Sequence, residues 1–142
     1  GFMKLEKGEI LVQGTPIHSG AAQNMGIIIE EPGFVNSLSG FENLKMLSSI
    51  WKKTSYEKIV LAMQKVGLES NMKKNVSKYS LGMRQRLGIA QAIIDDPPLL
   101  LLDEPMNGLD NDGVKEIRQL LLDLKGEGKT IILASHNRED VE

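Results

Sequence analysis

The stretch LLLLDEP at residues 99–105 decides the fold of this chain, because it places an unbroken apolar run directly before two carboxylates. Such a run is typical of a strand in a parallel sheet that is covered on both faces. A second run, TIILA at residues 130–134, predicts the next buried strand. Between them, apolar residues recur at threes and fours after a cluster of capping residues at 110–112, which predicts a helix of about four turns. Strand, helix and strand form a βαβ unit, so we predict an α/β fold.

More helices and strands are expected toward the amino end. Residues 80–94 predict a helix with Ser80 as its N-cap, which ends before the Pro-Pro pair at residues 97–98. Residues 40–67 predict two helices, the second capped by Ser55. Shorter strands are expected at residues 27–29 and at residues 9–12, the latter ending in a turn at residues 14–16.

Composition limits the possible functions. The chain has 142 residues, with 17 basic and 19 acidic side chains and a net charge of −2, and 41% of it is hydrophobic. This balance indicates one globular domain and excludes disorder. A charge near zero argues against a protein that mainly grips nucleic acid. The absence of cysteine removes disulfides and thiolate metal sites and fits a reducing compartment. The longest apolar runs fall far short of the roughly 20 residues that a membrane-spanning helix needs.

Candidate chemistry lies where the strands end, because ligands of open parallel sheets bind outside the carboxyl ends of the strands. Asp103 and Glu104 follow one strand, and His136 follows the next. Asp103 can hold Mg²⁺, while Glu104 can orient or deprotonate a water that attacks a phosphoryl group. His136 can hydrogen-bond the transferred phosphate. Glu30 occupies the same position after the strand at residues 27–29.

The helix that begins at Ser80 adds an anion site, since free N–H groups and the helix dipole at its start favour phosphate. Gly82 lies in that first turn. Taken singly, each feature has an ordinary structural explanation: a strand-end turn for the two carboxylates, a structural histidine, and a plain N-cap. Their occurrence in order, each on the required element, favours chemistry on phosphates.

These residues carry a resemblance to the ABC-type ATPases. YSLGMRQRL at residues 79–87 resembles the signature motif of that family, and LLLLDEP resembles its Walker B strand with the catalytic glutamate. NGLD at residues 107–110 resembles the D-loop, and His136 resembles the switch histidine. GIIIE at residues 26–30, with LSGFENL at residues 38–44, is similar to the Q-loop region. The resemblance implies a P-loop NTPase-like parallel sheet flanked by helices, with a helical insertion.

Two departures from the usual motifs point to one branch of the family. The signature usually reads Leu-Ser-Gly-Gly-Gln, whereas Tyr79, Leu81 and Met83 replace its first, third and fifth residues here. Glu30 stands where most members have Gln. Both variants resemble the bacitracin- and lantibiotic-type branch, whose members export or confer immunity to antimicrobial peptides in Gram-positive bacteria. Glutamate still offers an oxygen to Mg²⁺ or to the attacking water.

The phosphate-binding loop G-x-x-x-x-G-K-[ST] does not occur anywhere in the sequence. Residues 1–10 resemble the stretch just after that loop, so we expect a fragment of a larger ATPase, with an incomplete sheet and little activity alone. We expect three parts: residues 1–39 as the remnant of the core sheet with the Q-loop, residues 40–95 as the helical subdomain with the signature, and residues 96–142 as the core with the remaining motifs.

The resemblance implies an ATP-hydrolysing transporter subunit with ATP and Mg²⁺ as cofactors. Catalysis would fall to Glu104 and His136, and Mg²⁺ to Asp103 and Glu30. The residues expected to bind the nucleotide are Glu30, Ser80, Leu81, Gly82 and Asp110. Among them, the helix end at residues 80–82 would close on the γ-phosphate bound by a second subunit, and Asp110 would lie at the dimer interface. The expected partners are a second ATPase subunit, the same or different, and a transmembrane permease that meets the helices at residues 41–66. The expected location is peripheral, on the cytoplasmic side of the membrane, without nucleic acid.

Two alternatives remain open at the level of the sequence. A soluble ABC-type translation factor would carry a second signature and Walker pair elsewhere in its chain. A non-catalytic dimerisation or regulatory module would keep the fold without the phosphate-binding loop. Retention of Asp103, Glu104 and His136 argues against the second alternative, because such a module has no chemical need for them.

Overall fold

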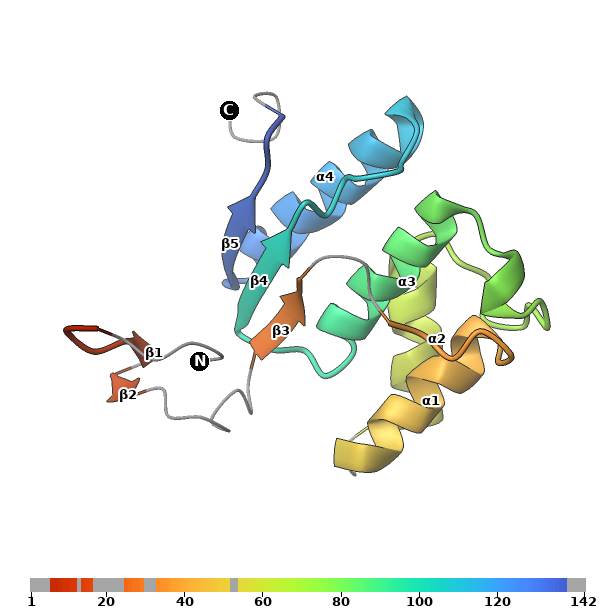
Figure 1. The fold of residues 1–142 in the computed structure, drawn as a ribbon, viewed down its shortest axis with the longest axis horizontal. Coiled ribbons are helices and arrows are strands. Elements are labelled where there is room, and N and C mark those ends of the chain that lie inside the picture. The colour runs from red at the N-terminus through yellow and green to blue at the C-terminus, as the bar shows by residue number, and fades with distance from the viewer. Residues whose placement is uncertain (1–5, 13, 17–24, 30–32, 52–53, 138–142) are drawn as a thin grey trace.

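The chain forms a parallel sheet with helices packed on it (Figure 1). The computed structural model describes residues 6–12, 14–16, 25–29, 33–51 and 54–137. The sheet runs in the order β3 (Met25–Ile28), β4 (Leu99–Asp103) and β5 (Thr130–Ala134). Both pairings are parallel, with Ile27 opposite Leu101 and Leu101 opposite Ile132. The predicted α/β class is confirmed: β4 and β5 lie within one residue of their predicted places, and β3 begins two residues before the predicted strand at residues 27–29.

The helices also follow the sequence pattern. They are α1 (Gly40–Trp51), α2 (Tyr56–Lys65), α3 (Leu81–Ile93) and α4 (Asn111–Gly126), with a 3-10 turn at Val76–Lys78. The predicted caps are confirmed, because the side chains of Ser55, Ser80 and Asp110 accept hydrogen bonds from the first turns of α2, α3 and α4. The helices α1 and α2 form the expected helical pair between β3 and α3.

Near the amino end, β1 (Leu11–Val12) pairs antiparallel with β2 (Thr15–Pro16). The prediction of a turn at residues 14–16 is wrong in part, because Thr15 and Pro16 belong to the second strand of a hairpin. Gly14 supports the tight reversal, since its φ of +76° lies in the left-handed region that glycine adopts without strain.

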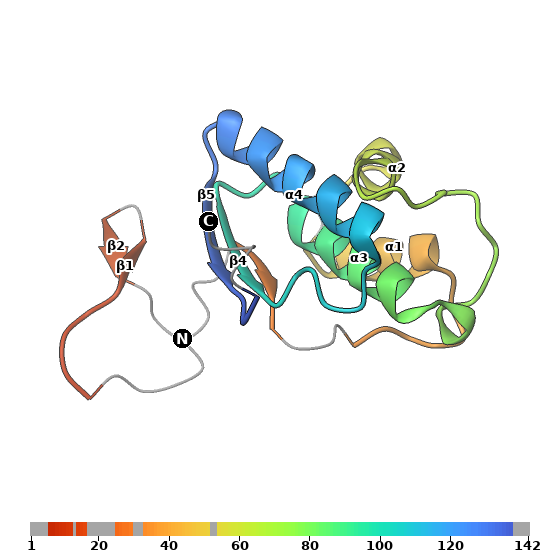
Figure 2. The same cartoon turned by 90° about the horizontal axis from the view of Figure 1, so that it is seen from above.

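The helices cover one face of the sheet, whereas the sequence predicts cover on both faces. In Figure 2, the α-helices of the described residues lie on one side of β3, β4 and β5. Leu100 and Leu102 face them and are buried, whereas Ile132 on the opposite face is 57% exposed. The prediction of strands covered on both faces is thus wrong for the described residues. The reason is topological: successive strands are added in one direction, and right-handed crossovers then place both connections on the same face.

The core lies between α3 and its neighbours. α3 packs against β3 on one side and α2 on the other, and Leu87, Ile89 and Ala90 of α3 are fully buried. Burying such side chains is the main stabilising term in a domain of this size. This packing fixes the position of the helix that begins at Ser80.

A buried tyrosine closes the start of α1. The Tyr79 hydroxyl accepts a hydrogen bond from the Gly40 N–H at 3.3 Å, and Tyr79 is 7% exposed. We expect Tyr79→Phe to lower the free energy of unfolding by about 1–2 kcal/mol, because it leaves a buried N–H without a partner. Urea denaturation measures the change. Tyr56→Phe is the matched control, since Tyr56 is 65% exposed and should lose no more than about 0.5 kcal/mol. Equal losses in both variants would contradict the role of the buried hydroxyl.

Candidate functional site

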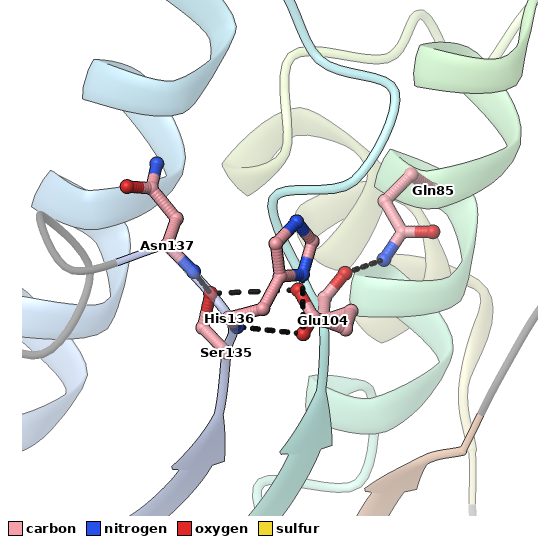
Figure 3. A network of polar contacts seen from close by, with 5 residues as sticks. All are labelled: Gln85, Glu104, Ser135, His136 and Asn137. Carbon is pink, nitrogen blue, oxygen red and sulfur yellow. Dashed lines mark hydrogen bonds and ion pairs between the residues drawn. The ribbon is translucent and has the colours of Figure 1, made fainter.

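The carboxyl ends of β4 and β5 bring Glu104 and His136 together (Figure 3). The two strands are in register, with Asp103 opposite Ala134, so the residues that follow each strand are neighbours. One Glu104 carboxylate oxygen, Oε1, lies 2.8 Å from His136 Nδ1 and accepts the His136 backbone N–H at 2.8 Å. The other, Oε2, accepts the Ser135 hydroxyl at 3.4 Å. The expected pairing of these strand ends is confirmed by this geometry.

The main chain of Glu104 is held in an unusual conformation. Its φ is +46°, in the left-handed region that a side chain other than glycine rarely adopts. The Glu104 N–H donates to the Ala134 carbonyl at 2.9 Å. The Glu104 carbonyl accepts from Gln85 Nε2 at 3.1 Å and from the Asn107 N–H at 3.0 Å. Contacts from β5, α3 and the following loop therefore fix the main chain of Glu104 on both sides of its Cα.

The surroundings keep Glu104 ionised. The hydrogen bond from the His136 ring lowers the pKa of the Glu104 carboxyl, partial burial opposes this, and the His136 N–H and the Ser135 hydroxyl lower the pKa further. An ionised carboxylate only accepts hydrogen bonds, so Nδ1 of His136 is the donor in their contact. The His136 side chain is 83% exposed and the Glu104 side chain 34% exposed. The site thus presents a carboxylate and an imidazole to solvent at the sheet edge.

The first turn of α3 packs against the loop that precedes α4. Ser80 Oγ accepts the Met83 N–H at 3.2 Å, as an N-cap does. A Cβ on Gly82 would lie 2.9 Å from the Gly108 carbonyl oxygen, and a Cβ on Gly108 would lie 2.4 Å from Leu81 Cγ. Only glycines allow this approach, so residues 81–82 and 108 form one closely packed surface. Leu81 itself stays 46% exposed.

Asp110 lies at the end of the same loop. Its Oδ1 accepts the Gly113 N–H at 2.9 Å and so caps α4. The residue is exposed, which leaves its second oxygen accessible to solvent or a partner. Asp110 follows two residues after Gly108, the residue of this loop that Leu81 and Gly82 approach.

Asp103 is the carboxylate at the end of β4 that suits a cation. It is partly exposed, and one oxygen ligand fits Mg²⁺, which keeps several waters and takes one or two carboxylates together with substrate phosphates. Within the described ranges, no group of three or more His, Cys, Asp or Glu residues could hold a metal by itself. Glu30, the other predicted ligand, lies outside the described residues.

Sequence reasoning missed Gln85. It is 5% exposed and shares a buried stripe of α3 with Gly88, Ile89 and Ala92, at helical spacing. A polar side chain on an otherwise buried stripe must find a hydrogen-bond partner. That spacing was visible in the sequence, although the partner was not.

The helices that the structure describes are too short or too polar to cross a membrane.

This chain is similar to known proteins over most of its length. Residues 1–107 match the family model described as "ABC transporter". The ABC transporter ATP-binding protein YhcH of Bacillus subtilis is 42% identical over 146 residues, which is all of this chain and 48% of that protein. The bacitracin transport ATP-binding protein BcrA of Enterococcus faecalis is 48% identical over 119 residues, which is 83% of this chain and 39% of BcrA. The lantibiotic transport ATP-binding protein SrtF of Streptococcus pyogenes is 39% identical over 142 residues, which is 100% of this chain and 62% of SrtF. The chain spans about half the length of the curated relatives it matches.

Solved structures agree on the fold. The dimeric bacterial ABC transporter cassette MJ0796 superposes with a TM-score of 0.85 at 22% identity, over 98% of this chain and 67% of that one. The cbiO1 protein of Clostridium perfringens, part of the ABC transporter complex cbiONQ, gives a TM-score of 0.78 at 29% identity, over 96% of this chain and 59% of cbiO1.

Proposed function

Since this chain belongs to the ABC transporter family of ATP-binding proteins, we propose that it supplies the residues of an ATPase site that carry out hydrolysis. The observation that carries the proposal is the Glu104 carboxylate held between His136 and Ser135 at the carboxyl end of the sheet. In this role Glu104 orients and deprotonates the water that attacks the γ-phosphate of ATP. ATP is the substrate, and the phosphate-binding loop absent from these residues would supply most of its affinity. The 142 residues alone are therefore expected to turn over little ATP.

The proposed contact of His136 with phosphate depends on the protonation state of its ring. Its Nδ1–H is engaged by Glu104, so Nε2 donates to a γ-phosphate oxygen only when the ring is the imidazolium. The histidine would then stabilise phosphate charge and keep the Glu104 carboxylate in place.

Asp103, with Glu30, is proposed to hold Mg²⁺. A hard cation of this kind supplies charge neutralisation on the phosphoryl oxygens. Asp103 follows the buried part of β4, which fixes its backbone at the same edge as Glu104. The chain's own contribution is therefore an oxygen ligand placed one residue before the proposed base.

A second ATPase subunit is the proposed partner for the exposed surface of Ser80, Leu81, Gly82 and Asp110. The N-terminus of α3 favours phosphate, and the close packing of residues 81–82 on Gly108 keeps that end rigid. We propose that these residues contact the nucleotide bound by the other subunit. The relative MJ0796 cassette has been solved as a dimer.

Transport of antimicrobial peptides is the proposed process that hydrolysis drives. The relatives BcrA and SrtF are transport ATP-binding proteins for bacitracin and a lantibiotic. We propose that α1 and α2 meet a transmembrane permease and that the protein works at the cytoplasmic face of the membrane, without nucleic acid.

The test is ATP hydrolysis by the product of the complete reading frame that carries this sequence. Asp103→Asn is expected to lower turnover by at least about tenfold, because it removes a charged oxygen ligand. Phosphate release at saturating Mg²⁺ and ATP measures the effect. Asp112→Asn is the matched control, since Asp112 is an exposed carboxylate on α4 whose partner is Lys115. Hydrolysis unaffected by Asp103→Asn would remove the proposed cation role, and no hydrolysis in the unmodified protein would favour the non-catalytic module.

A further inference from the structure

We propose that Gln85 is a positioning residue for Glu104 and that it ties the signature helix α3 to the carboxylate at the sheet edge. This inference rests on the proposed role of Glu104 in hydrolysis. Gln85 touches neither the phosphates nor the attacking water in this proposal. It acts through the backbone of Glu104.

The first step is the cost of burying the Gln85 amide. The residue is 5% exposed and shares a buried stripe of α3 with Gly88, Ile89 and Ala92. A buried amide without a partner destabilises the fold, so its hydrogen bond determines where it points. That bond runs from Nε2 to the Glu104 carbonyl at 3.1 Å, across nineteen residues of sequence. Figure 3 shows the Gln85 side chain reaching from α3 to the loop after β4.

The second step is the conformation of Glu104. A residue with a side chain keeps a φ of +46° only where its surroundings hold it there. The Ala134 carbonyl fixes the Glu104 N–H, and Gln85 together with the Asn107 N–H fixes the carbonyl. Without the Gln85 donor, the carbonyl loses its link to α3 and the peptide unit can rotate toward a less strained conformation. Rotation there would carry the carboxylate away from His136 and Ser135.

One helix, α3, connects Gln85 to the proposed phosphate contact. Gln85 lies on α3, and Ser80 caps the N-terminus of the same helix, where the proposed contact with the nucleotide of the second subunit lies. A rigid helix that moves at Ser80 therefore also moves the donor that holds Glu104. The fold thus gives a direct mechanical path from the intersubunit phosphate contact to the proposed base.

Gln85→Met tests the proposal, because Met has nearly the same length and no donor, with Gln64→Met on the exposed side of α2 as the matched control. Nuclear magnetic resonance of the 142-residue chain reads the Glu104 amide and carbonyl and the His136 amide. We expect Gln85→Met to shift these resonances and Gln64→Met to leave them unchanged. In the complete gene product, Gln85→Met should lower kcat by about 10- to 100-fold with little change in KM for ATP, as misplacement of a catalytic group does.

The outcomes separate the two proposals. Glu104 and His136 resonances that stay in place in a folded Gln85→Met variant, or a loss of thermal stability with kcat unchanged, would overturn the positioning role. If Gln85→Met does not fold, Gln85→Glu exchanges the donor for an acceptor at nearly constant size and is judged by the same resonances. The resonance measurement needs no ATP, so it still decides the role of Gln85 if Glu104 proves dispensable for hydrolysis.

Discussion

Glu104→Gln is expected to lower ATP turnover of the complete gene product by about 10²- to 10⁴-fold while nucleotide binding is retained. Glutamine has the size of glutamate, so the backbone contacts of Glu104 with Ala134 and Gln85 can persist. Its amide, however, cannot take a proton from water. Phosphate release measures turnover, and equilibrium binding of a fluorescent ATP analogue measures affinity.

The matched control for this variant is Glu69→Gln. Glu69 is an exposed carboxylate in the segment between α2 and the 3-10 turn, away from the sheet edge. Its substitution should change turnover by less than about twofold, as surface changes away from a site usually do. Normal turnover in Glu104→Gln would contradict the assignment of the base. Loss of nucleotide binding together with turnover would show that Glu104 supports the site rather than the chemical step.

The sequence was sufficient to predict which strand ends meet. Two apolar runs with a helix between them required parallel neighbours, and the carboxyl ends of parallel strands share one edge. The closeness of Glu104 and His136 follows from that rule and is confirmed at 2.8 Å. Helix starts were also predictable, because Ser55, Ser80 and Asp110 have side chains that satisfy free N–H groups.

Other features could not be predicted from the residues alone. The left-handed backbone of Glu104 has no local signal, since glutamate rarely adopts that conformation and only long-range contacts hold it. The apolar run of β5 indicated burial on both faces of the sheet. Which face the helical crossovers cover depends on the strand order, which the run does not contain. Gln85 gave a partial signal, because its place on a buried stripe required a partner that only the fold identifies.

The backbone of α3 packs tightly against β3 at Gly26. Gly26 lies in β3, and a Cβ at this position would lie 2.0 Å from the Ala92 carbonyl oxygen and 2.5 Å from Leu100 Cδ2. Helix backbone cannot yield as the end of a side chain can. We therefore expect Gly26→Ala to lower the free energy of unfolding by about 3 kcal/mol or more, at or above the usual range for overpacked cores. Urea denaturation of the 142-residue chain measures the loss.

Gly126→Ala is the control, because a Cβ there meets nothing within 4 Å and the residue ends α4. It should stabilise the chain by up to about 1 kcal/mol, since alanine loses less backbone entropy in a helix. Wherever Gly26→Ala still folds, α3 has to move away from β3, and Gln85 moves with it. The Glu104 resonances should then shift in Gly26→Ala and stay in place in Gly126→Ala. A Gly26→Ala variant as stable as the unmodified chain would mean that α3 does not pack on the sheet at this distance.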